Sequence, residues 1–194
     1  MTISEGGDKR RQILMAAVKV FSQKGFHDTK VDEIAQLADV GKGTVYEYFS
    51  SKAELFQEMF KSGMRLYAES VTEELKPKMS CWEKLARLAR LHIKFVSHYK
   101  DLARVTMSEH AHFDEDFRKW ILEHRAERIK EIEMIITEGI AGGEFRQVDP
   151  GAAARVFTGT LAAICSPVVF SRGRVDTKKL VEPAIDIIFY GLLK

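Results

Sequence analysis

Apolar side chains recur along this chain at the three- and four-residue spacing of an amphipathic helix, and the alternation typical of strands is nearly absent. In the first segment Ile13, Ala17 and Phe21 fall on one helical face, and Gly25 follows as a helix end. Only four prolines interrupt the 194 residues. The pattern therefore predicts an all-α fold of about nine helices.

Polar residues and glycines mark where the predicted helices begin and end. We expect Thr29 to cap a second helix and Asp39 to occupy the turn before a third, because aspartate tolerates a left-handed backbone better than most residues. Ser51 followed by Glu54 predicts a capping box for a fourth helix. The helices expected after these breaks span Lys42–Tyr48, Ser51–Leu75, Cys81–Tyr99, Asp101–Ala111, Asp114–Ala141, Asp149–Ser171 and Thr177–Leu193.

These breaks divide the chain into two expected domains. Residues 1–50 form a three-helix unit whose second and third helices make a helix-turn-helix, and residues 51–194 form a larger helical domain. On the third helix Lys42, Thr44, Tyr46 and Tyr48 can all donate to phosphate oxygens or base edges. The first domain is therefore expected to bind DNA.

The segment from Phe21 to Leu55 carries a longer motif, F-x-x-x-G-F-x-x-T-x-V-x-x-I-A-x-x-A-x-V-G-x-G-T-V-Y-x-Y-F-x-x-K-x-x-L. With Arg11, Ile13 and Leu14 before it, this run resembles the tetracycline-repressor (TetR) family of bacterial regulators. The resemblance implies an all-helical homodimer that binds DNA through its first three helices and a ligand through the remainder. The chain departs from the family pattern at the turn residue Asp39 and at the helix start Gly41.

The resemblance also implies which residues contact DNA. The residues expected to bind phosphates are Thr29, Tyr46, Tyr48 and Lys52. Those expected to read bases are Lys42 and Thr44. Gly43 would let the backbone approach the duplex. The alternative for the two tyrosines is that one ring packs in the small core. The complete expected DNA-binding set is Thr29, Lys30, Lys42, Gly43, Thr44, Tyr46, Tyr48 and Lys52.

A second resemblance concerns the expected ligand. The stretch from Arg104–Thr106 through Ile136–Phe145 is similar to regulators of fatty-acid degradation that bind long-chain acyl-CoA. This resemblance implies a hydrophobic effector, with an acyl ligand as one candidate. Arg104, Arg118 or Arg125 could meet its carboxylate or phosphate. Methionine and aromatic side chains suit an adaptable apolar pocket, although most of them could simply be core. The candidate pocket residues are Met59, Phe60, Met64, Tyr67, Phe95, Tyr99, Met107, His110, Phe113, Trp120 and Phe157.

Small residues follow one side of the last two predicted helices and allow close contact between helices. By the family resemblance these helices pair with the same two helices of a partner subunit, which gives an isologous four-helix interface. The expected interface residues are Ala152, Gly159, Ala163, Ala184, Ile187, Ile188 and Gly191.

Charge complicates the DNA-binding interpretation. The chain has 30 lysines and arginines against 28 acidic residues, so its net charge is +2, and many nucleic-acid binders are far more basic. Within residues 1–52 there are eight basic and seven acidic side chains. Several of the basic ones lie at helix starts, where backbone amides also attract anions. We therefore expect placed contacts and modest non-specific affinity.

The remaining features exclude other classes of protein. Two cysteines, Cys81 and Cys165, suit a reducing cytoplasm, and the N-terminus has no apolar secretory segment. The apolar run Phe157–Phe170 is too short to span a bilayer, so no membrane partner is expected. His110 and His112 are spaced so that they face different sides of a helix, and no metal or other cofactor is expected.

These observations predict a DNA-binding repressor, not an enzyme, because no catalytic motif is present. Its expected partners are double-stranded operator DNA, a small hydrophobic effector with acyl-CoA as one candidate, and a second copy of the chain. The alternative is a regulator that binds DNA without a ligand and whose C-terminal domain is a filled core.

Overall fold

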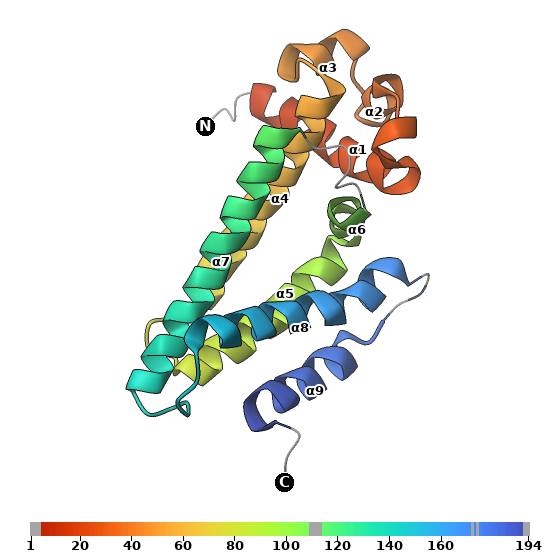
Figure 1. Cartoon of the computed structure of the whole chain (residues 1–194). Coiled ribbons are helices and arrows are strands. Elements are labelled where there is room, and N and C mark those ends of the chain that lie inside the picture. The colour runs from red at the N-terminus through yellow and green to blue at the C-terminus, as the bar shows by residue number, and fades with distance from the viewer. Residues whose placement is uncertain (1–4, 109–113, 172, 174, 192–194) are drawn as a thin grey trace. The chain divides into compact units, whose positions relative to one another are not determined.

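A computed structural model of the chain describes residues 5–108, 114–171, 173 and 175–191. Nine α-helices and no strands occur within these residues, as the hydrophobic spacing predicts (Figure 1). The helices are α1 (Glu5–Asp28), α2 (Val31–Leu37), α3 (Lys42–Tyr48), α4 (Lys52–Glu74), α5 (Cys81–His98), α6 (Lys100–Ser108), α7 (Glu115–Ala141), α8 (Pro150–Phe170) and α9 (Thr177–Tyr190).

The chain forms two compact units. Unit 1 comprises Met1–Leu66 with Asp101–Asp114, and unit 2 comprises Tyr67–Lys100 with Glu115–Lys194. The division between the units therefore falls inside α4. The DNA-binding domain of residues 1–50 that the sequence indicates remains a prediction.

In unit 1, α2 packs against both α1 and α3 (Figure 1). Ile13 and Ala17 of α1, Ile34 of α2 and Val45 of α3 are all buried. Beside them, the Phe21 ring lies 5.0 Å from the Phe56 ring at an interplanar angle of 86°. Aromatic pairs in this edge-to-face geometry add to the stabilisation from burial. The short helices are therefore held on α1 and the start of α4 by a shared apolar core.

The turn between α1 and α2 differs in part from expectation. Gly25 has φ 75°, which fits its predicted place at the end of the first helix because glycine tolerates this region. Thr29 does not cap α2: its hydroxyl donates a 2.6 Å hydrogen bond back to the carbonyl of Gly25. The cap position belongs to Lys30, and the Glu33 carboxylate accepts from the Lys30 backbone N–H. The cap prediction was wrong because the threonine completes the α1 turn instead.

The turns before α3 and α4 are close to those predicted. Asp39 has φ 53°, the left-handed conformation expected at that turn. At the start of α4 the Ser51 hydroxyl accepts a 3.0 Å hydrogen bond from the Glu54 N–H, as a capping box requires. The Glu54 carboxylate, however, accepts from the backbone N–H and hydroxyl of Ser50. The second half of the capping box is therefore displaced by one residue.

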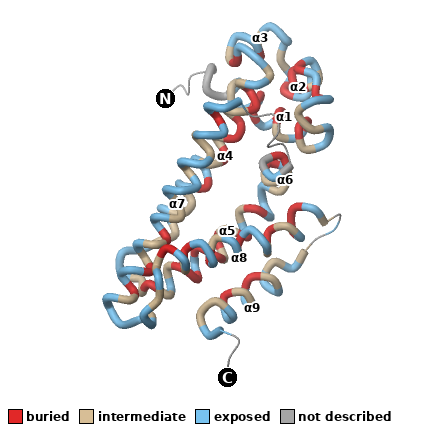
Figure 2. The backbone as a smooth tube through the Cα atoms, in the orientation of Figure 1, coloured by how far each residue is buried: buried red, intermediate tan, exposed pale blue. Residues whose placement is uncertain are grey.

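In unit 2, α5 packs against α7, α8 and α9, and buried and exposed positions alternate along it at helical spacing (Figure 2). A complete capping box formed by Ser80 and Glu83 starts this helix. The carboxylate of Glu144, from the segment after α7, also accepts from the backbone N–H groups of Cys81 and Trp82. These contacts fix the start of α5 against the end of α7.

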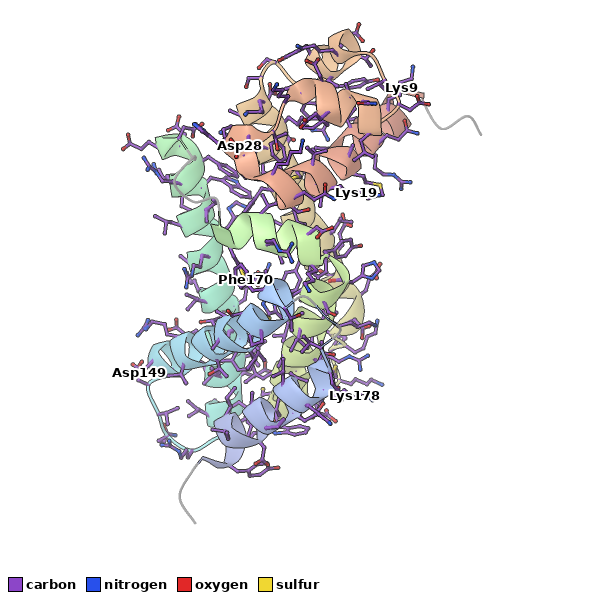
Figure 3. The ribbon with its side chains drawn as sticks, turned by 90° about the vertical axis from the view of Figure 1, so that its right-hand side faces the viewer. Lys9, Lys19, Asp28, Asp149, Phe170 and Lys178 are labelled. Carbon is purple, nitrogen blue, oxygen red and sulfur yellow. The ribbon has the colours of Figure 1, made fainter. Side chains whose placement is uncertain are left out.

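Helix α8 is apolar on nearly all sides. It begins as predicted, with the Asp149 side chain accepting from the Ala152 N–H and Pro150 in the first turn, and it extends to Phe170 (Figure 3). One face, which includes Phe157, is buried in unit 2. The helix extends well before the run Phe157–Phe170, so by length and composition alone it could cross a membrane. A helix covered by protein on two faces has the same composition.

Candidate nucleic-acid interface and effector site

The exposed face of α3 carries most of the predicted DNA-binding residues. Val45 is 1% exposed and anchors the helix in the core, whereas the Tyr46 side chain is 45% exposed. Lys42 and Gly43 are exposed, and Tyr48 is half-buried. Neither tyrosine belongs to the buried core, so the alternative of a core ring finds no support. Thr44 is half-buried on this helix, and Lys30 is exposed just before α2.

Lys42 is not surrounded by water alone. Its ammonium nitrogen lies 3.0 Å from a carboxylate oxygen of Asp32 on α2, and this hydrogen bond raises the pKa of Lys42 above its ordinary value. The next residue of α2, Glu33, forms a 2.7 Å ion pair with Lys24 of α1. An acidic side chain of α2 therefore lies beside Lys42, the lysine expected to contact DNA, a pairing that net charge alone does not reveal.

Thr29 and Lys52 are directed at the protein backbone. Thr29 is only 2% exposed. The Lys52 ammonium group donates to the carbonyl oxygens of Phe26 at 2.7 Å, Thr29 at 2.9 Å and His27 at 3.1 Å. It also lies 4.6 Å from the centre of the Phe26 ring. These interactions connect the start of α4 to the α1–α2 turn, so direct phosphate contact by either side chain remains a prediction.

Gly43 is exposed on α3 in an ordinary helical position. Beyond the adjoining turn of α3, a Cβ atom built at this residue would meet no atom of the described residues within 4 Å. The fold itself therefore does not require glycine here, although glycine in a helix costs about 1 kcal/mol relative to alanine. A requirement from outside the chain, such as close approach of DNA, is the role that the sequence predicts.

Unit 2 contains a polar cluster formed by Tyr67, His92 and Arg128. Tyr67 comes from α4, His92 from α5 and Arg128 from α7. The Tyr67 hydroxyl lies 3.1 Å from His92 Nδ1. The Arg128 guanidinium carbon lies 4.5 Å from the centre of the Tyr67 ring, a cation–π contact. Three helices thus bring three hydrogen-bonding groups together.

The cluster is electrostatically unusual. Burial raises the pKa of Tyr67 to about 12, against the opposing effect of Arg128. Loss of water contact, with a smaller contribution from the Arg128 charge, lowers the pKa of His92 to about 4. At neutral pH the histidine and tyrosine are therefore both uncharged, and the arginine supplies the positive charge of the cluster.

The structure brings some of the predicted pocket residues together and separates others. Tyr67, Phe95 and Tyr99 form a continuous aromatic row in unit 2, with ring centres 5.1 Å and 4.6 Å apart. Trp120 stacks on Phe117 at 5.5 Å, and Phe157 is buried in the same unit. Met59, Phe60, Met64 and Met107 belong to unit 1, and His110 and Phe113 lie outside the described residues.

Arg128 was missed by sequence reasoning. Among the arginines proposed as anion ligands, Arg118 and Arg125 are exposed on α7 and Arg104 lies in unit 1. Arg128 carries no motif that separates it from its neighbours on α7. His92 carries no such motif either, and among the described residues no group of three metal-binding side chains occurs. Its neighbours are hydrogen-bonding groups from distant helices, which only the fold reveals.

The expected dimer residues lie on the side of α8 and α9 that unit 2 leaves uncovered. Ala152, Gly159 and Ala163 are exposed along α8, and Val156 between them is 63% exposed. On α9, Ile187 and Gly191 are exposed and Ala184 and Ile188 are half-buried. Cys165, on the opposite side of α8, is buried, and burial raises the pKa of its thiol to about 12. The uncovered side is apolar and rich in small residues.

Comparison with known proteins places this architecture. The family model described as bacterial regulatory proteins, tetR family, matches residues 13–59, which include the predicted helix-turn-helix. The family model described as tetracyclin repressor-like, C-terminal domain, matches residues 78–192, more than half of the chain. The chain belongs to the TetR family.

Several TetR relatives match over nearly the full length. The fatty acid metabolism regulator protein of Bacillus subtilis is 30% identical over 185 residues, which are 95% of each chain. The crystal structure of FadR from Bacillus subtilis in complex with stearoyl-CoA has a TM-score of 0.84 at 29% identity, covering 94% of this chain and 99% of that one. The fatty acid degradation regulator FadR from Bacillus halodurans has a TM-score of 0.83 at 26% identity, covering 97% of each chain.

The TetR assignment establishes the broad function. The relatives are transcriptional regulators and not enzymes, and a homodimer is typical of the family. This chain is accordingly a DNA-binding transcriptional regulator whose helix-turn-helix is α2 and α3 of unit 1. A TetR protein carries its ligand site in the C-terminal domain, to which α5, α7, α8 and α9 belong here.

Proposed function

We propose that this TetR regulator is a repressor released from operator DNA by a long-chain acyl-CoA. One observation carries the proposal: the chain is similar over 94% of its length to a FadR structure that contains stearoyl-CoA. The aromatic row and the polar cluster of unit 2 support it, because an acyl thioester needs an apolar environment for its chain and a polar one for its head. We further propose that the protein acts in the cytoplasm.

The proposed DNA contacts come from the exposed side of unit 1. Lys42, Thr44, Tyr46 and Tyr48 on α3 would contact bases and phosphates, while Gly43 lets the helix approach the groove. Lys30 would add a phosphate contact beside α2. Thr29 and Lys52 remain in the proposed set, and their bonds to the α1–α2 turn support a role in holding the backbone N–H groups toward phosphates.

The proposed active form is a homodimer assembled through α8 and α9. The uncovered apolar side of these helices supports this assembly, and no lipid or membrane partner is needed to cover it. A dimer presents two recognition helices, which must stand about 34–36 Å apart to enter successive major grooves. An effector that binds better to a dimer with a different spacing would shift the population away from the DNA-binding state.

The direct test measures DNA binding by fluorescence anisotropy, using the region upstream of the protein's own gene. Purified protein should bind this fragment more tightly than scrambled DNA, with an affinity that falls as salt rises. Micromolar palmitoyl-CoA should release the DNA, whereas free CoA should not. An unrelated DNA-binding protein in the same buffer controls for detergent action of the acyl-CoA.

Two results would contradict the proposal in different ways. Absence of sequence-specific binding to any fragment from the region of its own gene would overturn the assignment of that operator. The second result is specific DNA binding that acyl-CoA does not reverse, in a protein that acyl-CoA does not stabilise against heat. This result would favour the alternative of a ligand-independent regulator with a filled core.

A further inference from the structure

The polar cluster of Tyr67, His92 and Arg128 contains a buried donor that no described residue uses. Arg128 Nε is buried and, within the described part of the chain, has no hydrogen-bond partner. The rest of the guanidinium lies over the Tyr67 ring and hydrogen-bonds to the Tyr67 side chain. A buried donor without an acceptor costs about 1–3 kcal/mol, and more when the group is charged. Such a group is more stable when an acceptor from outside the chain reaches it.

The neighbours of Arg128 limit what that acceptor can be. His92 is uncharged at neutral pH and the Tyr67 hydroxyl keeps its proton, so both offer neutral hydrogen-bonding groups beside one positive charge. Phe95 lies edge-on to Tyr67 at 5.1 Å, and Tyr99 continues the aromatic row. The surroundings therefore suit an oxygen acceptor attached to an apolar chain.

We propose that Arg128, together with His92 and Tyr67, binds the acyl carbonyl oxygen of the effector and places its hydrocarbon chain along the Phe95 side of the cluster. This inference rests on the proposed acyl effector. It adds the specific atom that is recognised and the residues that recognise it. The same chemistry is offered by the thioester carbonyl of an acyl-CoA and by the carboxylate of a free fatty acid.

The competing explanation is purely structural. Arg128 could serve only to cover the Tyr67 ring, since a cation–π contact stabilises a fold by itself. In that case its removal would weaken the folded unit and lower the affinity for every ligand equally. Recognition of a carbonyl makes a different prediction, because the loss would fall only on ligands that carry the carbonyl.

The experiment uses the full-length protein and isothermal titration calorimetry with three probes. Palmitoyl-CoA carries the thioester carbonyl, S-hexadecyl-CoA is the matching thioether without it, and palmitate carries a carboxylate without CoA. The test variant is Arg128→Met. The matched control is Arg125→Met, which removes the same charge from an exposed position on the same helix.

Wild-type protein should bind the thioester about tenfold or more tightly than the thioether, since a hydrogen bond to a charged donor contributes at least that much. Arg128→Met should lower this preference to about threefold or less while the affinity for the thioether changes little. Arg125→Met should keep the wild-type preference. If Arg128→Met is unfolded by circular dichroism, His92→Phe, which removes a hydrogen-bonding group from the same cluster, gives the same comparison.

Each remaining result has a definite reading. Equal wild-type affinities for thioester and thioether would overturn the carbonyl site and leave the acyl-CoA proposal standing. An unchanged preference in Arg128→Met would do the same. Binding of palmitate alone, lost in Arg128→Met, would support the site and overturn CoA as part of the effector. Binding of none of the three probes would overturn both proposals.

Discussion

The ammonium group of Lys42, at the start of α3, is held 3.0 Å from the carboxylate of Asp32 on α2. Lys42, a lysine proposed to read DNA bases, is thus paired with an acidic residue of the preceding helix, and both side chains are exposed. The chain as a whole has a net charge of only +2, and this pair adds nothing to it. The acid offsets part of the field that would attract any duplex, while contacts that depend on position are kept.

Asp32→Asn should therefore strengthen DNA binding with little regard to sequence. We expect an increase of about two- to fivefold at low salt, for operator and scrambled DNA alike, because one exposed ion pair is lost and one repulsive charge removed. Anisotropy titrations at several salt concentrations check this. Glu127→Gln, on α7 in unit 2, removes the same charge and should change neither affinity. A weaker binder would show that Asp32 instead orients Lys42 for contact.

Lys52→Met should destabilise the fold more than it weakens individual DNA contacts. The substitution leaves the carbonyl groups of Phe26 and Thr29 without their charged donor, and we expect a loss of about 1–3 kcal/mol in the free energy of unfolding. Urea unfolding followed by circular dichroism measures it. Lys30→Met should leave stability within about 0.5 kcal/mol and reduce DNA affinity, the reverse pattern. Equal stability of the two variants would contradict the role given to Lys52.

Gly43→Ala should raise the stability of the fold and weaken DNA binding, whereas Lys52→Met mainly lowers stability. The position is helical and open, so the new methyl group should raise stability by about 0.5–1 kcal/mol. The same methyl group should weaken operator binding if the helix backbone approaches the duplex there. Thermal unfolding and anisotropy on one protein sample provide both values. A variant that is more stable and binds as tightly as wild type would remove Gly43 from the interface.

Most of the fold could be predicted from the sequence because local signals and the final packing agree. The Asp149-Pro150 start of α8, the left-handed Asp39 and the Ser51 cap are all determined by neighbouring residues, and all occur as expected. The exception is Thr29. Its hydroxyl can accept a hydrogen bond from a backbone N–H at the start of α2 or donate one to the carbonyl of Gly25, and both groups lie within a few residues. The sequence alone does not show which choice the chain makes.

The site was less predictable for the same physical reason. Tyr67, His92 and Arg128 are separated by 25 and 36 positions and meet only because α4, α5 and α7 pack together. Arg128 looks like its exposed neighbour Arg125 in the sequence, and one turn of helix decides which of them reaches the tyrosine. The residue types predicted an apolar pocket lined by aromatic side chains. They did not predict which charged side chain would lie beside those rings.

Gly159→Arg should prevent dimerisation without harming the subunit. Apart from the adjoining turn of α8 itself, no described atom lies within 4 Å of a Cβ built at this position, so the side chain can extend from α8. It would nevertheless block the close approach of a second α8. Light scattering after size-exclusion chromatography should report a monomer of about 22 kDa, the mass of one chain. Operator affinity should fall with it. Ala126→Arg, exposed on α7, is the control and should remain dimeric.

The low pKa of His92, about 4, links stability to pH. In the unfolded chain the imidazole binds a proton below about pH 6.5, whereas the folded protein takes it up only near pH 4. The contribution of neutral His92 to the free energy of unfolding is therefore fully present above about pH 6.5. As the pH falls toward 4, up to about 2–3 kcal/mol of this contribution is lost. Urea unfolding at pH 7 and pH 5 should show a smaller difference for His92→Gln than for wild type. His98→Gln, exposed on the same helix, should retain the wild-type difference.

Helix α8 has an apolar face inside its own subunit and a second apolar side open to solvent, and its length and composition match those of a membrane span. In the proposed dimer a second copy covers this side, so a newly made subunit would expose a surface that chaperones and proteases recognise until it meets its partner. The cellular amount of this regulator would then depend on how fast subunits meet as well as on how fast they are made. Mutations at the outer side of α8 would lower its abundance before they altered any contact with DNA.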